Sequence, residues 1–292
     1  MKKQKIIPHL WFEKDAVEAA KFYVDTFNRS KINNISVIKN TPSGDVDLVE
    51  FQIFGYEFMA VSAGPYFTPN PSISFMINFD PSQDKDAKEN IKRVWKKLSE
   101  EGKVLMPLAE YPFSKLYGWI EDRYGFSWQL IYTDPEGDER PLIIPSFSFA
   151  GDMYGKTKEA TDFYLSIFKD SKRASLVNYP PGSEPNQSEA LMFTDFKLEG
   201  QWFAAADTIL DTEFQFNEAV SLLVNCKNQQ EIDYYWEKLS SVPESEQCGW
   251  LKDKFGVSWQ IVPENLNELM AKNPDAFNEK LFKMKKIIIS DL

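Results

Sequence analysis

The chain has 292 residues, of which 43% are apolar and 15% aromatic, so it can build packed cores and is not a disordered polymer. A net charge of −11 argues against nucleic acid and anionic membrane surfaces as partners, since both attract clustered Lys and Arg. No apolar run reaches the roughly 20 residues of a bilayer span, and the two cysteines, Cys226 and Cys248, form no CxxC pair. We therefore expect a soluble, cytoplasmic protein without disulfides.

The first half of the sequence predicts one series of elements twice. Apolar residues at spacings of three and four, from Ala16 through Tyr23 to Phe27, favour a helix, and alternating stretches around it favour strands. The expected order is strand 5–12, helix 16–27, strands 32–40, 46–54 and 56–63, then strand 72–79, helix 86–100 and strands 103–110, 116–121 and 126–133. Each series is a β-α-β-β-β module.

The second half repeats the first. IIPHLWF (6–12) matches IIPSFSF (143–149), and ISFMINF (73–79) matches VSLLVNC (220–226). The interval between Leu239 and Gly249 is shorter than the matching interval between Leu98 and Gly118. The fourth module therefore lacks the full hairpin of the second. The polar segment 134–141 reads as a linker.

These boundaries predict three parts of the chain. The first domain spans 1–135 and the second spans 142–265. The remainder, 266–292, is expected to form a helix interrupted at Asn273–Pro274 and an apolar tail at 287–289 that adds to a sheet edge or plugs a groove.

A repeated motif ends each half: YGWIEDRYGFSWQ (117–129) and CGWLKDKFGVSWQ (248–260). Gly125 and Gly256 stand where a hairpin turn favours a residue that tolerates positive φ. Strand alternation sends Gln129 to one face, together with Ser127 and Ile131, and sends Trp128 and Leu130 to the other. We expect the Trp128 face to be core.

Paired β-α-β-β-β modules, the FYxxxF pattern on the first helix of each half, and the GWxxDxxGxSWQ motif together resemble the vicinal oxygen chelate superfamily. Within it, the chain is similar to the PhnB-like, or 3-demethylubiquinone-9 3-methyltransferase-like, proteins. The resemblance implies an α+β fold of four βαβββ modules in two tandem glyoxalase-like domains with half-open mixed β-barrels. It also implies that the two halves pair as an internal pseudo-dimer, while a further homodimer stays open.

Metalloenzymes of this superfamily hold a divalent ion with His, Glu or Gln from four strands. Carried over residue by residue, these places are His9, about Ala60, Ser74 and Gln129 in the first half, and Ser146, about Ala205, Ser221 and Gln260 in the second. A catalytic zinc ion takes three strong protein ligands, which neither set supplies. We therefore expect no metal and no cofactor. The nearest candidates for a metal are His9, Glu57 and Gln129.

The same positions are candidates for ligand contact without a metal. A buried glutamine amide requires hydrogen-bond partners, and small-molecule pockets combine aromatic walls with a few polar groups. The candidate ligand-binding residues are His9, Trp11, Ser74, Trp119, Gln129, Ser146, Ser221, Trp250 and Gln260. No catalytic residue is assigned.

Three functions stay open on this basis. The chain could bind an unknown small molecule without a metal, act as a metal-dependent lyase, isomerase or dioxygenase, or serve a structural role with filled clefts. A methyltransferase function is not supported, because the chain has no Gly-rich loop of the kind that binds S-adenosylmethionine after a first strand. A bound metal ion that is lost when His9 is replaced would favour the metal-dependent enzyme.

Overall fold

The computed structural model describes residues 3–41, 43–134, 140–180, 182, 190–209 and 214–292. The predicted linker 134–141 therefore lies largely outside the described residues. The chain divides into two compact units, and each combines parts of both sequence halves. Unit 1 comprises residues 1–22, 31–68 and 216–292, and unit 2 comprises residues 23–30 and 69–215.

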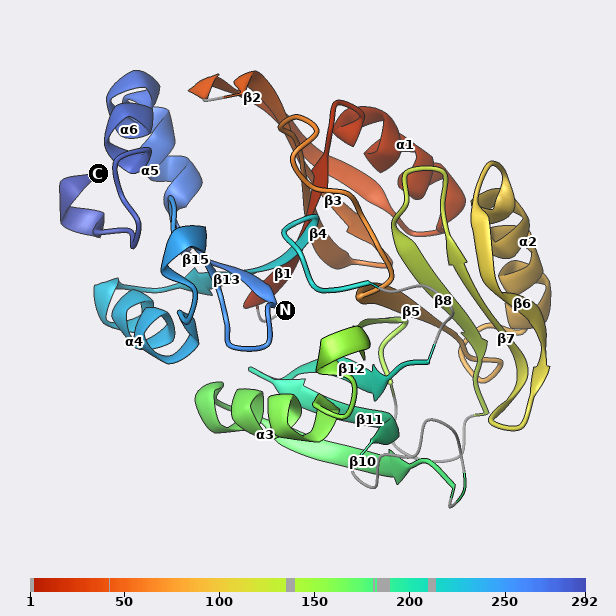
Figure 1. Ribbon diagram of the computed structural model, residues 1–292. Coiled ribbons are helices and arrows are strands. Elements are labelled where there is room, and N and C mark those ends of the chain that lie inside the picture. The colour runs from red at the N-terminus through yellow and green to blue at the C-terminus, as the bar shows by residue number, and fades with distance from the viewer. Residues whose placement is uncertain (1–2, 42, 135–139, 181, 183–189, 210–213) are drawn as a thin grey trace. The chain divides into compact units, whose positions relative to one another are not determined.

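Unit 1 contains a seven-stranded mixed sheet in the order β14-β15-β13-β1-β4-β3-β2. Its strands are β1 (Ile6–Phe12), β2 (Lys31–Thr41), β3 (Gly44–Ile53), β4 (Tyr56–Ser62), β13 (Val220–Cys226), β14 (Trp250–Lys252) and β15 (Ser258–Pro263). Its helices are the first part of α1 (Ala16–Thr26), α4 (Gln229–Leu239), α5 (Leu266–Lys272) and α6 (Pro274–Leu281). The orange strands β2, β3 and β4 run side by side in Figure 1.

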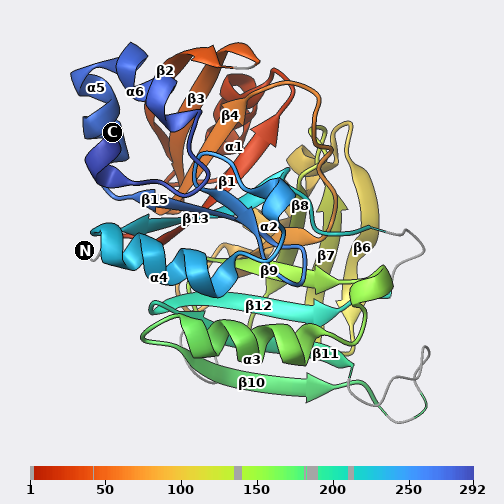
Figure 2. The same cartoon turned by 60° about the vertical axis from the view of Figure 1, so that its left-hand side comes forward.

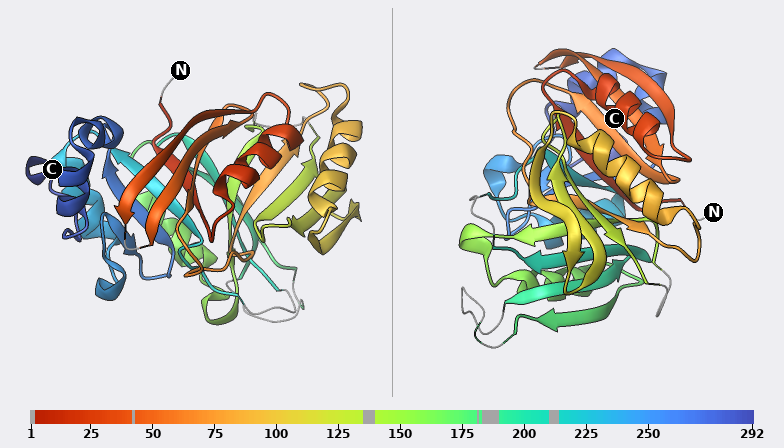
Figure 3. Two further views of the ribbon diagram at one scale, coloured as in Figure 1. Left: turned by 90° about the horizontal axis from the view of Figure 1, so that it is seen from above. Right: turned by 90° about the vertical axis from the view of Figure 1, so that its right-hand side faces the viewer.

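Unit 2 contains an eight-stranded mixed sheet in the order β10-β11-β12-β9-β5-β8-β7-β6. Its strands are β5 (Ile73–Phe79), β6 (Lys103–Tyr111), β7 (Ser114–Glu121), β8 (Ser127–Tyr132), β9 (Ile143–Phe149), β10 (Lys172–Asn178), β11 (Leu191–Leu198) and β12 (Gln201–Asp207). Its helices are α2 (Ala87–Ser99) and α3 (Thr157–Ile167). Helix α3 lies along β11 and β12 in Figure 2, and α2 lies against β7 and β8 in Figure 3.

The order of elements confirms the predicted modules, including the trimmed fourth module, which runs β13-α4-β14-β15. Each sheet is open, since it ends in two edge strands, in agreement with the half-open barrels. At the centre of the unit 1 sheet, β1 pairs antiparallel with β13, and at the centre of the unit 2 sheet, β5 pairs antiparallel with β9. The first module therefore shares a sheet with the fourth, and the second shares a sheet with the third.

Helices cover one face of each sheet, and that face carries the tryptophans that the motif assigns to the core. Trp128 is fully buried against Phe75 and Phe27, and Trp259 is fully buried as well. Helix α2 packs on β7 and β8, and helix α4 packs on β13 and β15. Since residues along a strand alternate, the opposite face of each sheet is left to carry the polar residues of the motif.

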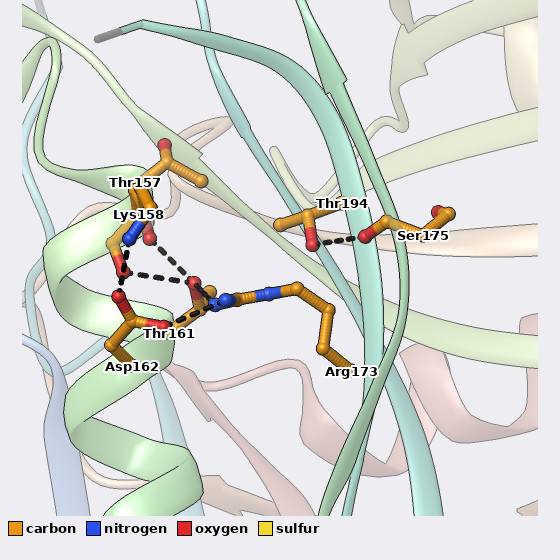
Figure 4. A network of polar contacts seen from close by, with 7 residues as sticks. All are labelled: Thr157, Lys158, Thr161, Asp162, Arg173, Ser175 and Thr194. Atoms are coloured by element: carbon orange, nitrogen blue, oxygen red, sulfur yellow. Dashed lines mark hydrogen bonds and ion pairs between the residues drawn. The ribbon is translucent and has the colours of Figure 1, made fainter.

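Polar contacts fix helix α3 to the edge of the unit 2 sheet (Figure 4). Arg173 reaches from β10 to the helix and donates to Asp162 at 2.6 Å and to the hydroxyl of Thr161 at 2.5 Å. On β11, the hydroxyl of Thr194 donates to the backbone carbonyl of Ser175 at 2.7 Å. These contacts stabilise β10 at the end of the sheet, where it has one neighbouring strand.

The C-terminal segment docks on unit 1 through backbone hydrogen bonds. The N–H of Cys248 donates to the carbonyl of Met284 at 2.8 Å, and that of Gly249 donates to Lys285 at 2.7 Å. Ile287 is fully buried, and a side chain at position 249 would come within 3.0 Å of it. Residues 287–289 form no strand, so the tail packs on unit 1 without adding to its sheet. The predicted interruption of the helix is confirmed, because α5 ends at Lys272 and α6 begins at Pro274.

Within the described residues, no helix is both long and apolar enough to cross a membrane.

Candidate ligand site

The face of the unit 1 sheet that carries His9, called here the His9 face, brings residues of the first and fourth modules into one row. His9 stands opposite Ser221 on one side and Met59 on the other, and Met59 stands opposite Glu50. Gln260 reaches Ser221 from the next strand, with its Nε2 donating to the serine hydroxyl at 2.9 Å. Residues directly opposite each other share a face of the sheet, so these side chains converge.

The corresponding face of unit 2, the Ser146 face, follows the same plan with other residues. Ser146 stands opposite Ser74 and Ala204, and Ala204 stands opposite Asp195. Gln129 donates from Nε2 to the hydroxyl of Ser74 at 2.6 Å. Each position on one face thus has a counterpart on the other, as the sequence repeat implies.

The predicted grouping of the site residues by sequence half is wrong. His9 shares its face with Ser221 and Gln260 from the second half, because β1 pairs with β13. Ser74 and Gln129 share theirs with Ser146, because β5 pairs with β9. The fourth-strand position also shifts by one residue, from the predicted Ala60 to Met59 and from Ala205 to Ala204.

The candidate tryptophans Trp250 and Trp119 lie in different sheets. Trp250 stands opposite Gln260 in unit 1, and Trp119 stands opposite Gln129 in unit 2. Trp119 is buried and donates its indole N–H to the hydroxyl of Ser127 at 2.7 Å. The ring of Trp250 lies edge-on to His9 with their centroids 5.6 Å apart. Trp119 therefore belongs to a closed polar pair, whereas Trp250 forms part of the His9 surroundings.

Neither face fits the divalent metal of glyoxalase-type enzymes. On the His9 face the four positions hold an imidazole, a thioether, a hydroxyl and an amide, and on the Ser146 face they hold no imidazole or carboxylate. Of the three candidates, His9 and Glu57 belong to the unit 1 sheet and Gln129 belongs to the unit 2 sheet. Among the described residues, no three His, Cys, Asp or Glu side chains gather as a metal ion would require.

His9 is a neutral, buried side chain with an unused nitrogen. It is 5% exposed, and burial lowers its pKa to about 4, so the imidazole carries no charge at neutral pH. Its Nδ1 has no hydrogen-bond partner among the described residues. Since a buried polar atom without a partner is costly, Nδ1 is a position at which a ligand gains a hydrogen bond.

The two glutamines of the motif differ in how fully they are bonded. In unit 2 the amide of Gln129 is satisfied at both ends, because the hydroxyl of Tyr117 donates to Oε1 at 2.8 Å and Nε2 donates to Ser74. In unit 1 the place of Tyr117 is taken by Cys248, and no donor from the described part of the chain reaches Oε1 of Gln260. The His9 face therefore offers a second free acceptor.

The Ser146 face is closed by the chain itself. The Arg140 guanidinium lies over the indole of Trp202, 3.9 Å from the ring centroid, and donates to buried Asp195 at 2.8 Å. Lys197 approaches the same ring at 4.6 Å, and the hydroxyl of Ser175 donates to Asp195 at 2.6 Å. Gln129 and Asp195, the two largest polar groups of this face apart from Arg140, thus already have side-chain partners.

The His9 face instead opens into a groove of about 200 Å³. Its floor is apolar and is formed by Ile7, Met59, Leu223 and Val262. Ile7 is two residues from His9 on the same strand face, and Met59 stands directly opposite His9. The groove is therefore lined by the immediate neighbours of His9 on this face and not by His9 itself.

The rim of the groove is charged. Glu50, Glu57 and Lys3 line it, together with Asn267 of α5, whose amide donates to Glu50 at 2.7 Å. The carboxylate of Glu57 has no hydrogen-bond or ion-pair partner within the described part of the chain. The lining thus includes three glutamates, Glu264 being the third, and one lysine beside an apolar floor.

Aromatic side chains fill the other end of the His9 face. The ring of Trp11 lies edge-on to Trp250 at 6.0 Å and to Phe67 at 5.1 Å. The Trp11 indole donates to the backbone carbonyl of Gly64 at 2.8 Å, which fixes its orientation. Trp11 and Trp250 therefore form a wall on one side of His9, while the groove lies on the other.

Sequence reasoning missed the acidic residue inside the repeated motif. Asp122 accepts the backbone N–H groups of Tyr124 and Phe126 and the hydroxyl of Tyr23. Burial raises its pKa to about 6, although these hydrogen bonds oppose that shift. The identity of Asp122 and Asp253 in the two copies was the available signal, and it marks a structural role.

Arg140 and Asp195 were missed as well. Arg140 falls at the end of the predicted linker, and Asp195 falls inside an apolar strand, so neither stands out in the sequence. A buried acid in a strand calls for a partner, and that requirement was the signal. Nothing in the sequence identified the partner as Arg140.

The 3-demethylubiquinone-9 3-methyltransferase family model matches the chain twice, over residues 4–131 and 142–262. A PhnB protein structure from Bacillus cereus is 38% identical over 44% of this chain and 100% of its own, with a TM-score of 0.40. Glyoxalase I from Zea mays is 12% identical over 92% of this chain and 97% of its own, with a TM-score of 0.54. No curated protein matches the chain significantly. The similarity to glyoxalase I concerns the fold alone.

Proposed function

Because the chain belongs to the 3-demethylubiquinone-9 3-methyltransferase, or PhnB-like, family, we propose that it uses the glyoxalase fold to bind a small molecule without a metal. The binding place is the groove on the His9 face of unit 1. The family name includes a methyltransferase, but this proposal does not assign that activity. The mixed open sheets of this chain differ from the doubly wound parallel sheet of a dinucleotide-type fold.

One observation carries the proposal: Nδ1 of His9 is buried and has no partner, next to an open groove. On the Ser146 face, by comparison, Gln129 bonds to Tyr117 and Ser74, and Asp195 bonds to Arg140. Gln260 adds a free Oε1 two strands away, while its counterpart Gln129 has none. A ligand that donates to His9 and Gln260 would satisfy both groups.

In this proposal the His9 face and the Ser146 face have different roles. Unit 1 binds the ligand, and unit 2, whose face is filled by Arg140, Trp202 and Asp195, stabilises the fold. Duplication permits such a division, because one copy can keep an open face while the other acquires a packed one. Neutral His9 would act as a hydrogen-bond acceptor or donor and not as a charged group.

The proposal is tested with a small-molecule screen read by the imidazole Hε1 resonance, because His9 is the only histidine in the chain. Ligands that shift this signal are then titrated by calorimetry, and they should bind at least about tenfold more weakly to His9→Ala and Gln260→Ala, which each lose one hydrogen bond. Gln129→Ala is the matched control in unit 2 and should bind as tightly as the native chain. Equal weakening by Gln129→Ala and Gln260→Ala would refute the assignment to unit 1.

A further inference from the structure

The repeat assigns a counterpart to the arginine that closes the Ser146 face. Arg140 precedes Ile143, the first residue of β9, by the same interval by which Lys3 precedes Ile6, the first residue of β1. The two residues therefore hold equivalent places at the ends of the two faces. Their surroundings differ, and that difference indicates what the groove of unit 1 binds.

In unit 2 the chain itself supplies a cation to the face. The guanidinium of Arg140 is held between an aromatic surface, Trp202 at 3.9 Å, and a buried carboxylate, Asp195 at 2.8 Å. Cation–π attraction and a charge-assisted hydrogen bond both favour a guanidinium in this place. The face thus has the chemistry of an organic-cation site that is permanently occupied.

In unit 1 the equivalent positions hold more negative charge, and no cationic side chain of the described residues pairs with them. Glu50 takes the place of Asp195, because Glu50 stands opposite Met59 as Asp195 stands opposite the equivalent Ala204. Glu57 takes the place of Trp202, because each lies two residues before that residue, on β4 and on β12. Replacing a bulky indole by a glutamate leaves space, and the groove lies there. The ammonium of Lys3 donates to the backbone carbonyl of Glu264 at 3.2 Å and bonds to neither carboxylate.

Within the described part of the chain, neither of these two carboxylates has an ion-pair partner. Glu50 accepts one hydrogen bond from the neutral amide of Asn267 at 2.7 Å. Glu57 has no side-chain partner among the described residues, as stated above. Beside them, buried His9 keeps an unpartnered Nδ1 on the same face, opposite the groove-lining Met59. A built site that lacks its occupant explains these unused groups better than a packed face does.

We propose that the groove takes an organic cation, a guanidinium or primary ammonium carried on an apolar chain. Glu50 and Glu57 bind the charged end, as Asp195 binds Arg140 in unit 2, and the apolar chain lies on Ile7 and Leu223. This inference rests on the proposed function, whose site it shares, and it adds the class of ligand. The apolar floor beside the carboxylates can be covered by the alkyl chain of an amphiphilic cation, whereas a hydrated metal ion would leave it exposed.

The first experiment titrates butylguanidinium and butylammonium into the native chain and follows the His9 Hε1 signal. Both should shift it. Glu50→Gln and Glu57→Gln should each weaken binding at least about tenfold, as expected for loss of a charge-assisted hydrogen bond. Glu57→Trp copies the unit 2 residue into the groove and should abolish the shift, while exposed Glu89→Gln should leave it unchanged.

The second experiment uses unit 2 as an independent check. Arg140→Ala empties the equivalent site, so ethylguanidinium should raise the melting temperature of that variant by several degrees more than it raises that of the native chain. Arg140→Lys, which keeps a cation, should show less rescue. Equal effects of ethylguanidinium on all three chains would overturn the equivalence of the two sites.

The outcomes separate the inference from the proposed function. If butyrate or butanol shifts the His9 signal and the cations do not, the groove binds a ligand and the inferred class is wrong. If Mn²⁺ alone displaces the cations and its binding is lost in both Gln variants, the site is a metal site and the inference fails. If no compound of a broad screen shifts the signal, the proposed function fails with it.

Discussion

Trp128 donates its indole N–H to the carboxylate of Asp122 at 2.8 Å, across the six residues of the motif's turn. The second copy repeats this bond between Trp259 and Asp253 at 2.9 Å. In both copies the other carboxylate oxygen accepts backbone N–H groups of the turn, while Gly125 and Gly256 adopt φ of +85° and +87°. The conserved spacing inside the repeat thus builds a buried turn, and the motif is a folding signature before it is a site.

Replacing this aspartate should destabilise the chain strongly. Asp122→Ala leaves the indole of Trp128 and the hydroxyl of Tyr23 without their acceptor inside the core. The expected loss is about 2–4 kcal/mol in the free energy of unfolding. Urea unfolding followed by tryptophan fluorescence measures it, with exposed Asp134→Ala as the control. A loss below about 1 kcal/mol would contradict this account of the motif.

Acid should destabilise the chain through His9. Its pKa is about 4 in the folded chain and about 6.5 in the unfolded chain, so the unfolded state binds the proton more tightly. The stability from neutral His9 is therefore complete above pH 6.5 and is lost as the pH falls from 6.5 towards 4, by up to about 3 kcal/mol. His9→Gln should lose less stability over this range.

The same group gives a direct measurement. The Hε1 signal of the single histidine should titrate with a midpoint near pH 4 in the folded chain. Unfolding in urea should move the midpoint to about 6.5. A folded midpoint at or above 6 would show that the imidazole is not buried as described.

The two motif glutamines should differ in their contribution to stability. Gln129→Ala leaves the buried hydroxyls of Tyr117 and Ser74 without a partner, whereas Gln260→Ala leaves that of Ser221. We expect losses of about 2–4 and about 1–2 kcal/mol, respectively, in the free energy of unfolding. Differential scanning calorimetry of both variants checks the order, and the reverse order would contradict the difference between the two faces.

The ion pair that closes the Ser146 face should be energetically coupled. A double-mutant cycle of Arg140→Ala and Asp195→Ala should give an interaction free energy of about 1–3 kcal/mol, because Asp195 is buried and hydrogen-bonded. The exposed pair of Lys115 and Asp134 is the matched control and should give less than about 1 kcal/mol. Equal coupling energies would mean that Arg140 is not part of a closed site.

The sequence alone determined the elements and the faces of the strands. The bounds of β1, β5 and β8 follow from alternation, and the burial of Trp128 opposite Gln129 follows from a period of two. Such patterns are local, so a strand reveals which of its residues face the core without reference to its partner. The repeat then extended each assignment to the second half, including the shortened fourth module.

Only the tertiary structure decided which strands lie side by side. Pairing of β1 with β13 places His9 on the same sheet face as Ser221 and Gln260. The order of the sequence halves had instead grouped His9 with Gln129. Arg140 and Asp195 likewise meet through the fold and not through any pattern. Hydrogen bonds between strand edges are formed by backbone groups that every residue carries. The choice of neighbour is therefore set by the packing of the whole sheet, and with it the distinction between an open face and a filled one.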